Sequence, residues 1–460
     1  MGTALPTRQS RPRTASSATL RPSLLASAIL LVIPVGAGAA DLEYELGMSV
    51  LHSDNIALSS FDETSDTVVS PSLRFTLDQQ SSWLRTKASG SVAYLDYLSN
   101  TFDSEVRGDL AGEMLWSVLP RRIDFVVNDY LNRQPVNVLT GFNPTNQQQV
   151  NVFIAGPTFH ARFSDGFRGQ LDLRYANTYA ETTDDFNGNH YNAAARLLRD
   201  TSANQSVSVN LESSQSEYDD PADNYRRDDA YIGYSLRLAA LELTAAGGYS
   251  RVRLEDGSGD HGQPLARAAV TWSPTARSRL VAVARQGFSN AAQDLVNRTT
   301  DLEGSIINEL SSNDVLVSAE AVKQQELYLA YHFDSERWAF HAQPYYQRSR
   351  SIGTAVTGPV DPANPDPASL ATRDSYGGLF AVDYRLSSRS TVSLLLAHDE
   401  NRYDDIDRKD RGYIAALSLA HRLSRHWSWR ADLQHRQRDS SVAAASYDEN
   451  AAVFSVAYLR

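Results

Sequence analysis

The feature of this sequence that most limits its fold is the two-residue period of its apolar residues. From residue 41 to residue 460, apolar side chains recur at alternate positions over stretches of roughly ten residues. Leu241 and Leu243, for example, alternate with Glu242 and Thr244. This alternation produces a β-strand with one apolar and one polar face. Because about ten residues is the length that a tilted strand needs to cross a bilayer, the pattern predicts transmembrane strands.

The segments between the predicted strands alternate in length. Nine are short turns, and they occur at residues 79–82, 119–121, 164–166, 201–204, 239–240, 273–275, 334–336, 387–389 and 423–425. The long polar segments include residues 132–146, 217–223, 256–264, 291–314 and 351–373. Short turns at one rim and long loops at the other are typical of outer-membrane barrels.

Nine short turns, with both chain ends on the turn side, imply about 18–20 strands, because residues 291–321 leave one hairpin undecided. We therefore predict an all-β fold. Residues 41–460 form a single transmembrane antiparallel up-and-down β-barrel, with short periplasmic turns and long extracellular loops. The alternation leaves no stretch for a separate plug domain.

A soluble β-sandwich is the rival architecture, since its strands also bury one face. Strand length and the asymmetry between turns and loops favour the barrel. Aromatic residues near the strand ends also favour it, because such residues form girdles at membrane interfaces. The residues that we assign to these girdles are Trp116, Tyr130, Tyr179, Trp338, Trp427 and Trp429.

Residues 1–40 are predicted to be a signal peptide. They contain four arginines and no acidic residue, followed by the apolar run 24–35 and the small residues 36–40. The apolar run is too short to span a membrane comfortably, which argues against a retained anchor. Because the whole chain carries a net charge of −12, removal of these four arginines leaves −16. The expected location is the bacterial outer membrane.

Composition excludes several classes of protein. The chain has no cysteine, so disulfides, thiolate metal sites and cysteine nucleophiles are excluded. It has three lysines and no arginine-rich stripe, which argues against binding to nucleic acid. No apolar run beyond residue 40 reaches the length of a membrane helix. We expect no metal and no cofactor.

Several short motifs resemble a known family. They are Trp116-Ser117-Val118-Leu119-Pro120-Arg121-Arg122, Asn128-Asp129, Asn143-Pro144-Thr145-Asn146 and Val150-Asn151-Val152-Phe153-Ile154-Ala155-Gly156-Pro157. Together they resemble the β-barrel porin 2-like outer-membrane proteins of proteobacteria, some of which accompany exopolysaccharide synthesis and export. The resemblance implies a porin barrel and, less directly, an association with polysaccharide export.

Charged residues on the polar face of the strands are the candidate pore-lining residues. An arginine facing lipid at the membrane midplane would cost about 2 to 4 kcal/mol, so such charges belong in the lumen. The candidates are Glu326, His341, Asp383, Arg385, Arg422, Arg430, Asp432 and Arg436. The arginines outnumber the acids on the C-terminal strands, which predicts a locally positive wall that attracts anionic solutes. The other reading of these charges is a set of ion pairs that brace the lumen.

The predicted function is passive passage of polar solutes, with secretion of exopolysaccharide as its more specific form. A general small-solute porin is the alternative within transport. From other classes, we consider a structural or adhesive barrel and an acyl enzyme using the lipid-facing His398 and His435. No nucleophile motif accompanies these histidines, so we predict no enzyme activity. Expected partners are outer-membrane lipid and lipopolysaccharide, the barrel-assembly machinery and a polysaccharide-export complex.

Overall fold

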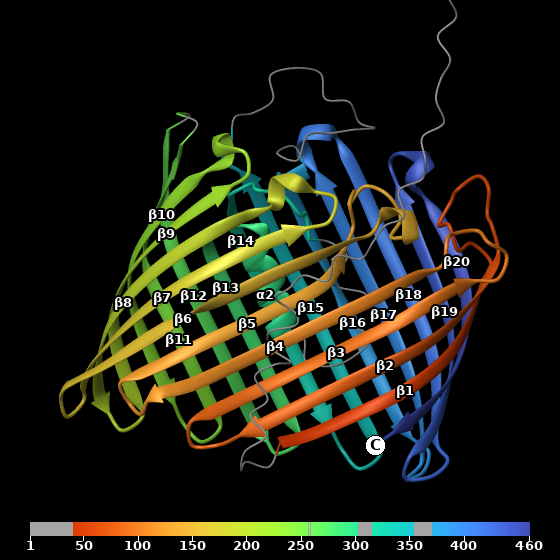
Figure 1. The fold of residues 1–460 in the computed structure, drawn as a ribbon, viewed down its shortest axis with the longest axis horizontal. Helices are drawn as coiled ribbons and strands as arrows, with labels where there is room; N and C mark the ends of the chain where they lie inside the picture. Colours follow the sequence, from red (N-terminus) through yellow and green to blue (C-terminus); the bar gives the residue numbers. More distant parts are fainter. Residues whose placement is uncertain (1–39, 256, 258, 302–314, 354–369) are drawn as a thin grey trace, which may run out of the picture. The chain divides into compact units, whose positions relative to one another are not determined.

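Twenty antiparallel strands form one closed barrel in the part of the chain that the structure describes (Figure 1). The structure is a computed structural model, and it describes residues 40–255, 257, 259–301, 315–353 and 370–460. The predicted signal peptide therefore lies outside the described residues, apart from Ala40, which begins the first strand. Each strand pairs with its neighbours in the sequence, which is the predicted up-and-down order.

The strands are 12 to 17 residues long, longer than the ten or so that span the bilayer, because they continue beyond it at both rims. The first ten are β1 (Ala40–Ser53), β2 (Asp66–Gln80), β3 (Leu84–Tyr97), β4 (Glu105–Leu119), β5 (Ile123–Gln134), β6 (Gln148–Ser164), β7 (Phe167–Ala180), β8 (Gly188–Ser202), β9 (Gln205–Tyr218) and β10 (Tyr225–Arg237). The others are β11 (Leu241–Leu254), β12 (Asp260–Thr275), β13 (Ser278–Ser289), β14 (Val322–Asp334), β15 (Trp338–Ser351), β16 (Arg373–Arg385), β17 (Ser390–Tyr403), β18 (Arg408–Arg422), β19 (Trp427–Ser440) and β20 (Tyr447–Leu459).

The barrel closes between its first and last strands. β1 and β20 pair from Glu45 opposite Leu459 to Ser53 opposite Ala451. The last residue extends this pairing, because the backbone groups of Tyr44 and Arg460 exchange two hydrogen bonds of 2.9 Å each. Closure leaves no edge strand with unpaired backbone groups, which a bilayer cannot hydrogen-bond.

All nine predicted turns join strands at one rim, which we call the turn side, and the longer connections lie at the opposite rim, the loop side. The predicted barrel and its strand number are confirmed. One element was not predicted: helix α2 (Ala291–Asp301) follows β13 in the segment that the sequence left ambiguous. Among the described residues, no helix is long and apolar enough to cross a membrane.

The two faces of the wall differ as the alternation predicts. The outward face carries large apolar side chains that remain exposed, among them Leu433 and Ile232 at 61% and Leu211 at 59%. Such a broad apolar surface suits contact with lipid rather than water. Trp116, Tyr179, Trp338 and Trp427 are 43–50% exposed, on the same face, as expected for girdle residues.

Tyr130 is not a girdle residue. Its side chain points into the barrel, is only 3% exposed, and donates a hydrogen bond of 3.0 Å to Oε1 of Glu113. Sequence parity could not place it, because both faces of β5 carry polar residues, with Asn128 on one and Asp129 on the other.

Leu433 and Gln434 provide a direct test of the two faces. They are consecutive residues near the middle of β19, so their side chains point to opposite faces of the wall. Leu433 is paired with outward-facing Leu417. We expect Leu433→Arg to lower the free energy of unfolding by about 2 to 4 kcal/mol, because it places a charge in lipid near the midplane. Gln434→Arg faces the aqueous lumen and should have a much smaller effect. Denaturant unfolding in lipid vesicles measures both; equal losses would show that both faces are buried, as in a sandwich.

Candidate functional site

The candidate site is the lumen, the space enclosed by the inward faces of the strands. Val150 and Val152 of β6 mark this face, because they pack against α2 within the barrel. Cross-strand pairing extends the inward face round the wall, since paired residues share a face. One such row runs through Asp383, Ser393, Ser418 and Asp432 on β16 to β19.

The predicted pore-lining residues all lie on inward-facing positions of one continuous arc of wall, from β14 to β19. Arg385 and Arg430 lie at the same level, on a row that passes through Thr391 and Ala420. Asp383 and Asp432 occupy the next row, and Arg422 lies beside the last short turn, exposed to solvent. The structure thus brings these residues onto a shared wall; their role in conduction remains a prediction.

The arginines of this wall have acidic partners. Nε of Arg430 is 2.6 Å from Oδ1 of Asp432, and Nε of Arg436 is 3.8 Å from Oε2 of Glu449. Nη1 of Arg385 is 2.9 Å from Oδ1 of Asp334 in the turn-side rim. Three of the four predicted arginines thus have an acidic partner, whereas Arg422 is exposed beside the last short turn. These pairs agree with the reading of the charges as bracing ion pairs, and the locally positive wall stays a prediction.

The two remaining predicted residues are also engaged with neighbours. Oε2 of Glu326 is 3.3 Å from Nη1 of Arg285 on β13. Nε2 of His341 is 2.9 Å from Oε1 of Gln343, and its ring centroid is 5.8 Å from that of His332. These contacts hold the side chains of Glu326 and His341 against neighbouring residues of the wall.

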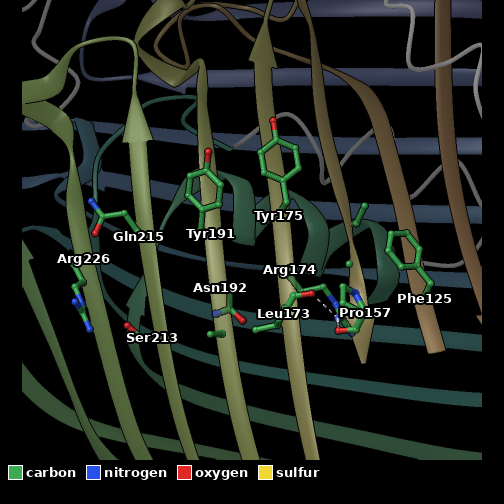
Figure 2. A pocket seen from close by; sticks show the side chains of 13 residues that line it. Phe125, Pro157, Leu173, Arg174, Tyr175, Tyr191, Asn192, Ser213, Gln215 and Arg226 are labelled. Atoms are coloured by element: carbon green, nitrogen blue, oxygen red, sulfur yellow. Dashed lines mark hydrogen bonds between the residues drawn. The ribbon is translucent and has the colours of Figure 1, made fainter. Parts of the chain in front are cut away.

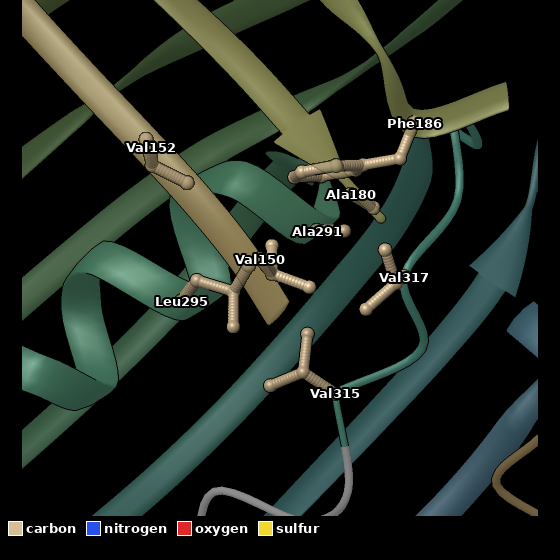
Figure 3. Packing of buried hydrophobic residues seen from close by; sticks show 8 residues of the cluster. All are labelled: Val150, Val152, Ala180, Phe186, Ala291, Leu295, Val315 and Val317. Atoms are coloured by element: carbon tan, nitrogen blue, oxygen red, sulfur yellow. The ribbon is translucent and has the colours of Figure 1, made fainter. Parts of the chain in front are cut away.

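Helix α2 narrows the lumen from one side. Asn290 caps it by accepting a hydrogen bond of 2.9 Å from the backbone N–H of Gln293. Figure 3 shows Leu295 of α2 against Val150 of β6, with Phe186 and Val317 completing the contact. All of these side chains are at most 5% exposed. The chain leaving β13 is thus fixed inside the barrel by a small apolar core rather than lying over its rim.

An ionic cluster on the wall holds the same segment from another side. Arg227 of β10 donates hydrogen bonds of 3.2 Å to the carbonyl oxygen of Phe288 and to Oε1 of Gln293. Its guanidinium lies 3.6 Å from Asp229 and 3.8 Å from Glu212. The carboxylate of Asp229 is almost fully buried, so the cluster is a dry junction between wall and helix.

The connection between β5 and β6, residues 135–147, narrows the lumen from another side. It reaches across to β18 and β19, where Arg438 donates to the carbonyl oxygens of Thr140 at 2.9 Å and Val138 at 3.1 Å. Arg408 donates to the carbonyl of Leu139. Asp410 orients both guanidinium groups, at 3.0 Å from Arg408 and 2.6 Å from Arg438.

These two inward segments meet on the loop side. Leu316, which follows α2 in the chain, packs against the cluster of Val138, Leu139 and Tyr403. The described structure is therefore a wide barrel narrowed at its loop-side entrance. Sequence reasoning missed the residues that do this, because adjacent charges such as Arg226-Arg227-Asp228-Asp229 and Arg408-Lys409-Asp410-Arg411 obscure which member faces inward. The hydrogen bonds of these arginines to distant loops correspond to no pattern in the sequence.

The motifs that carry the family resemblance lie mainly in the wall, except that Asn143-Pro144-Thr145-Asn146 belongs to the β5–β6 connection. On the outward face of the wall, Nδ2 of Asn151 donates to Oδ1 of Asp129 at 2.7 Å. At Gly156 and Pro157 the pairing of β6 with β7 is interrupted, and Nη1 of Arg174 donates to the carbonyl oxygen of Pro157 at 2.8 Å. These residues shape the strands and do not form a sugar-binding pattern in the lumen.

This interruption lies beside an outward-facing groove of about 660 Å³. Figure 2 shows Tyr175 and Tyr191 side by side in the middle of the residues that line it, with Phe125 toward one end and Arg226 toward the other. A second outward-facing groove, of about 480 Å³, crosses β15 to β19 and includes His398 and His435. The ring of His398 stacks on Tyr413 at 4.6 Å. No serine or threonine is among the described residues that line this second groove.

In the described part of the chain, no group of three or more His, Asp or Glu side chains is placed to hold a metal ion.

Residues 371–459 match the family described as "Putative beta-barrel porin 2". This match confirms the predicted resemblance, and it does so through β16 to β20 rather than through the motifs at residues 116–157 that first indicated it. The match covers less than half of the chain, so it shows similarity to this porin family over β16 to β20. Comparison with curated proteins gives no match.

Solved structures of outer-membrane proteins show distant likeness. A mutant of the ferric enterobactin receptor PfeA from Pseudomonas aeruginosa is 11% identical, with a TM-score of 0.47 over 92% of this chain and 81% of that one. The siderophore receptor PirA from the same organism is 13% identical, with a TM-score of 0.45 and the same coverage. OpdK from P. aeruginosa, solved with vanillate, is 11% identical, with a TM-score of 0.37 over 91% of this chain and 99% of that one.

Asp410 is the residue on which the inward position of the β5–β6 connection most depends. Its side chain is 3% exposed and forms ion pairs with two largely buried guanidinium groups, those of Arg408 and Arg438. We expect Asp410→Asn to reduce the free energy of unfolding by about 3 to 5 kcal/mol, because it leaves buried charge without its partner. Unfolding in guanidinium chloride, followed by tryptophan fluorescence, measures the loss.

Asp165→Asn is the matched control. Asp165 also lies 2.6 Å from an arginine, Arg162, but its side chain is 99% exposed. Water and salt weaken such a pair, so its loss should change stability little. Similar effects of the two substitutions would contradict the inferred burial of the Asp410 cluster.

Proposed function

We propose that the protein is a passive outer-membrane pore for polar solutes, with its passage narrowed on the loop side by the two inward segments. The observation that carries this proposal is the position of α2 and of residues 135–147 inside a closed twenty-stranded wall. A barrel of this width cannot be filled by its own side chains, so its interior holds water unless loops close it. The narrowing then limits the size of the solute.

Charge balance supports weak ion selectivity. The arc from β14 to β19 carries arginines in ion pairs with acids, as with Arg430 and Asp432. Paired charges give a polar wall without a strong field of one sign, which suits neutral or mixed polar solutes. The proposal includes no catalytic step, and no serine or threonine lines the described groove that contains His398 and His435.

Partners follow from the proposed location. The outward apolar face would contact lipid, the loop-side rim would contact lipopolysaccharide, and the amphipathic strand β20 would be the segment that barrel-assembly machinery receives. Association with a polysaccharide-export complex, and secretion of exopolysaccharide, remain hypotheses that rest on the family resemblance alone.

Replacing residues 291–321 with a short Gly-Ser linker tests the proposed narrowing. Without α2 and the segment that follows it, the ionic path should widen, and single-channel conductance in planar bilayers should rise several-fold. The chain has no native cysteine, so a second variant, Val150→Cys with Leu295→Cys, can fix α2 to the wall through a disulfide. That variant should conduct like the unmodified protein in both oxidised and reduced forms.

The matched control replaces the β19–β20 connection, residues 441–446, with a Gly-Ser segment of the same length. Most of these residues are exposed at the rim, so this change should leave conductance unaltered. Conductance that is unaffected by loss of residues 291–321 would contradict the narrowing, and absence of channels in every variant would contradict the pore.

A further inference from the structure

The outward face of β15 to β18 carries a cluster of cations at the loop-side rim. Cross-strand pairing aligns Arg348, Asp374, Arg402 and Lys409 in one row, and Tyr346, Tyr376, Glu400 and Arg411 in the row beneath it. With Arg350, these rows contain five cations, which we call the rim cluster. Because they share the face of Leu394 and Leu417, they point away from the lumen and toward the membrane surface.

Three of these cations converge on one carboxylate. The oxygens of Glu400 lie 2.6 Å from Nζ of Lys409, 3.0 Å from Nε of Arg411 and 3.5 Å from Nη2 of Arg402. The hydroxyl of Tyr376 also hydrogen-bonds Glu400. The carboxylate is only 6% exposed, whereas the side chains of Arg402 and Arg411 are 54% and 47% exposed. One buried acid thus gathers three cations whose charge it cannot balance.

The neighbouring acids do not remove this excess. Asp374 lies 2.8 Å from Arg350 and 3.4 Å from Arg348, and Asp404 lies 2.9 Å from Arg350. Asp439 of β19 lies opposite Arg411 in the same row. Four acids therefore contact or lie opposite the five cations of the rim cluster, which leaves an excess of one positive charge.

An apolar groove continues directly from the rim cluster toward the middle of the wall. The next two rows contain Pro344, Gly378, His398 and Tyr413, and then Ala342, Phe380, Leu396 and Ala415. These residues line the groove of about 480 Å³. Gly378 keeps it open, because a Cβ atom there would lie 3.1 Å from Cα of Pro344. Cationic groups above an apolar groove match an anionic headgroup carrying acyl chains.

We propose that this surface is a binding site for a phosphorylated glycolipid of the outer leaflet, such as the lipid A part of lipopolysaccharide. Guanidinium groups of Arg402 and Arg411, with the ammonium group of Lys409, bind the phosphate, and an acyl chain lies along Phe380 and Leu396. Arginine suits this role, since its fork of N–H donors matches two phosphate oxygens. The site is independent of conduction through the lumen.

The other outward-facing groove lacks this charge pattern. Its rim contains Arg226, and Nε of Arg226 lies 3.1 Å from Oδ1 of Asp228. Arg253 lies opposite Arg226 and, with Arg251, contacts Asp260, so no carboxylate at this rim forms ion pairs with three cations as Glu400 does. The comparison explains why the proposal assigns the glycolipid to β15–β18, although the first groove is the larger of the two.

Binding of bisphosphorylated lipid A to the detergent-solubilised full-length protein, measured by native mass spectrometry, tests the proposal. We expect Arg402→Gln with Arg411→Gln to weaken binding at least tenfold. Glu400→Gln should strengthen it, because that change removes the carboxylate that competes with phosphate for the same cations. Slower migration after boiling confirms that each variant still forms the barrel.

Matched controls separate this site from general electrostatic attraction. Arg251→Gln with Arg253→Gln removes two outward-facing arginines of β11 that are each 47% exposed and lie around Asp260. This control should bind lipid A like the unmodified protein, and dephosphorylated lipid A should not distinguish the variants. Equal losses at both pairs of arginines would overturn the proposal. Saturation by inorganic phosphate alone at equal affinity would also overturn it, since the site would then bind free phosphate rather than lipid.

Discussion

Pairing of backbone polar groups between neighbouring strands is the constraint on which the rest of this structure depends. Hydrocarbon offers no hydrogen-bond partner, so a strand-built membrane protein must close on itself. Here closure is made by β1 and β20 and extends to Arg460, the last residue of the sequence. Once the wall is closed, alternation assigns each side chain to lipid or lumen, and the positions of both the pore-lining charges and the rim cluster follow from that assignment.

Charge pairing is the second organising interaction. Buried or half-buried arginines hold the inward segments, through Arg227 at α2 and through Arg408 and Arg438 at residues 135–147. Elsewhere on the inner wall, arginines pair with acids across neighbouring strands, as Arg436 does with Glu449. The rim cluster differs, because its cations exceed its acids and face outward. Ion pairs between arginines and acids thus brace the inner wall where the two are balanced, and they leave positive charge exposed where the cations outnumber the acids.

Alternation and turn spacing were enough to predict the barrel, because both are local properties of the sequence. The turns, the strand order and the inward direction of Arg430 and Asp432 followed from them. Ion pairs between residues distant in sequence could not be predicted in this way. Asp334 lies 51 residues from Arg385, and only the strand register brings the two side chains together. The position of α2 inside the barrel was not predicted either, because contacts with Val150 and Phe186 determine it rather than the sequence of the helix itself.

Family resemblance and local geometry carry different information. The motifs around Asn151 and Pro157 proved to be features of the wall, where an amide and a carboxylate pair and a proline interrupts the ladder. They do not specify a solute. Some of their residues also take part in the narrowing and in the first groove: Val150 packs against α2, and Gly156 and Pro157 line that groove. These roles depend on contacts with distant segments, so they emerged only from the three-dimensional arrangement.

The most direct measurement of the central claim is polymer exclusion from single channels of the unmodified protein, with poly(ethylene glycol) of graded size added to one side at a time. If α2 and residues 135–147 narrow only the loop-side entrance, polymers should enter from the turn side at larger sizes than from the loop side. Discrete channels with this asymmetry are the predicted result. Equal size limits from the two sides, or no channels at all, would contradict the account.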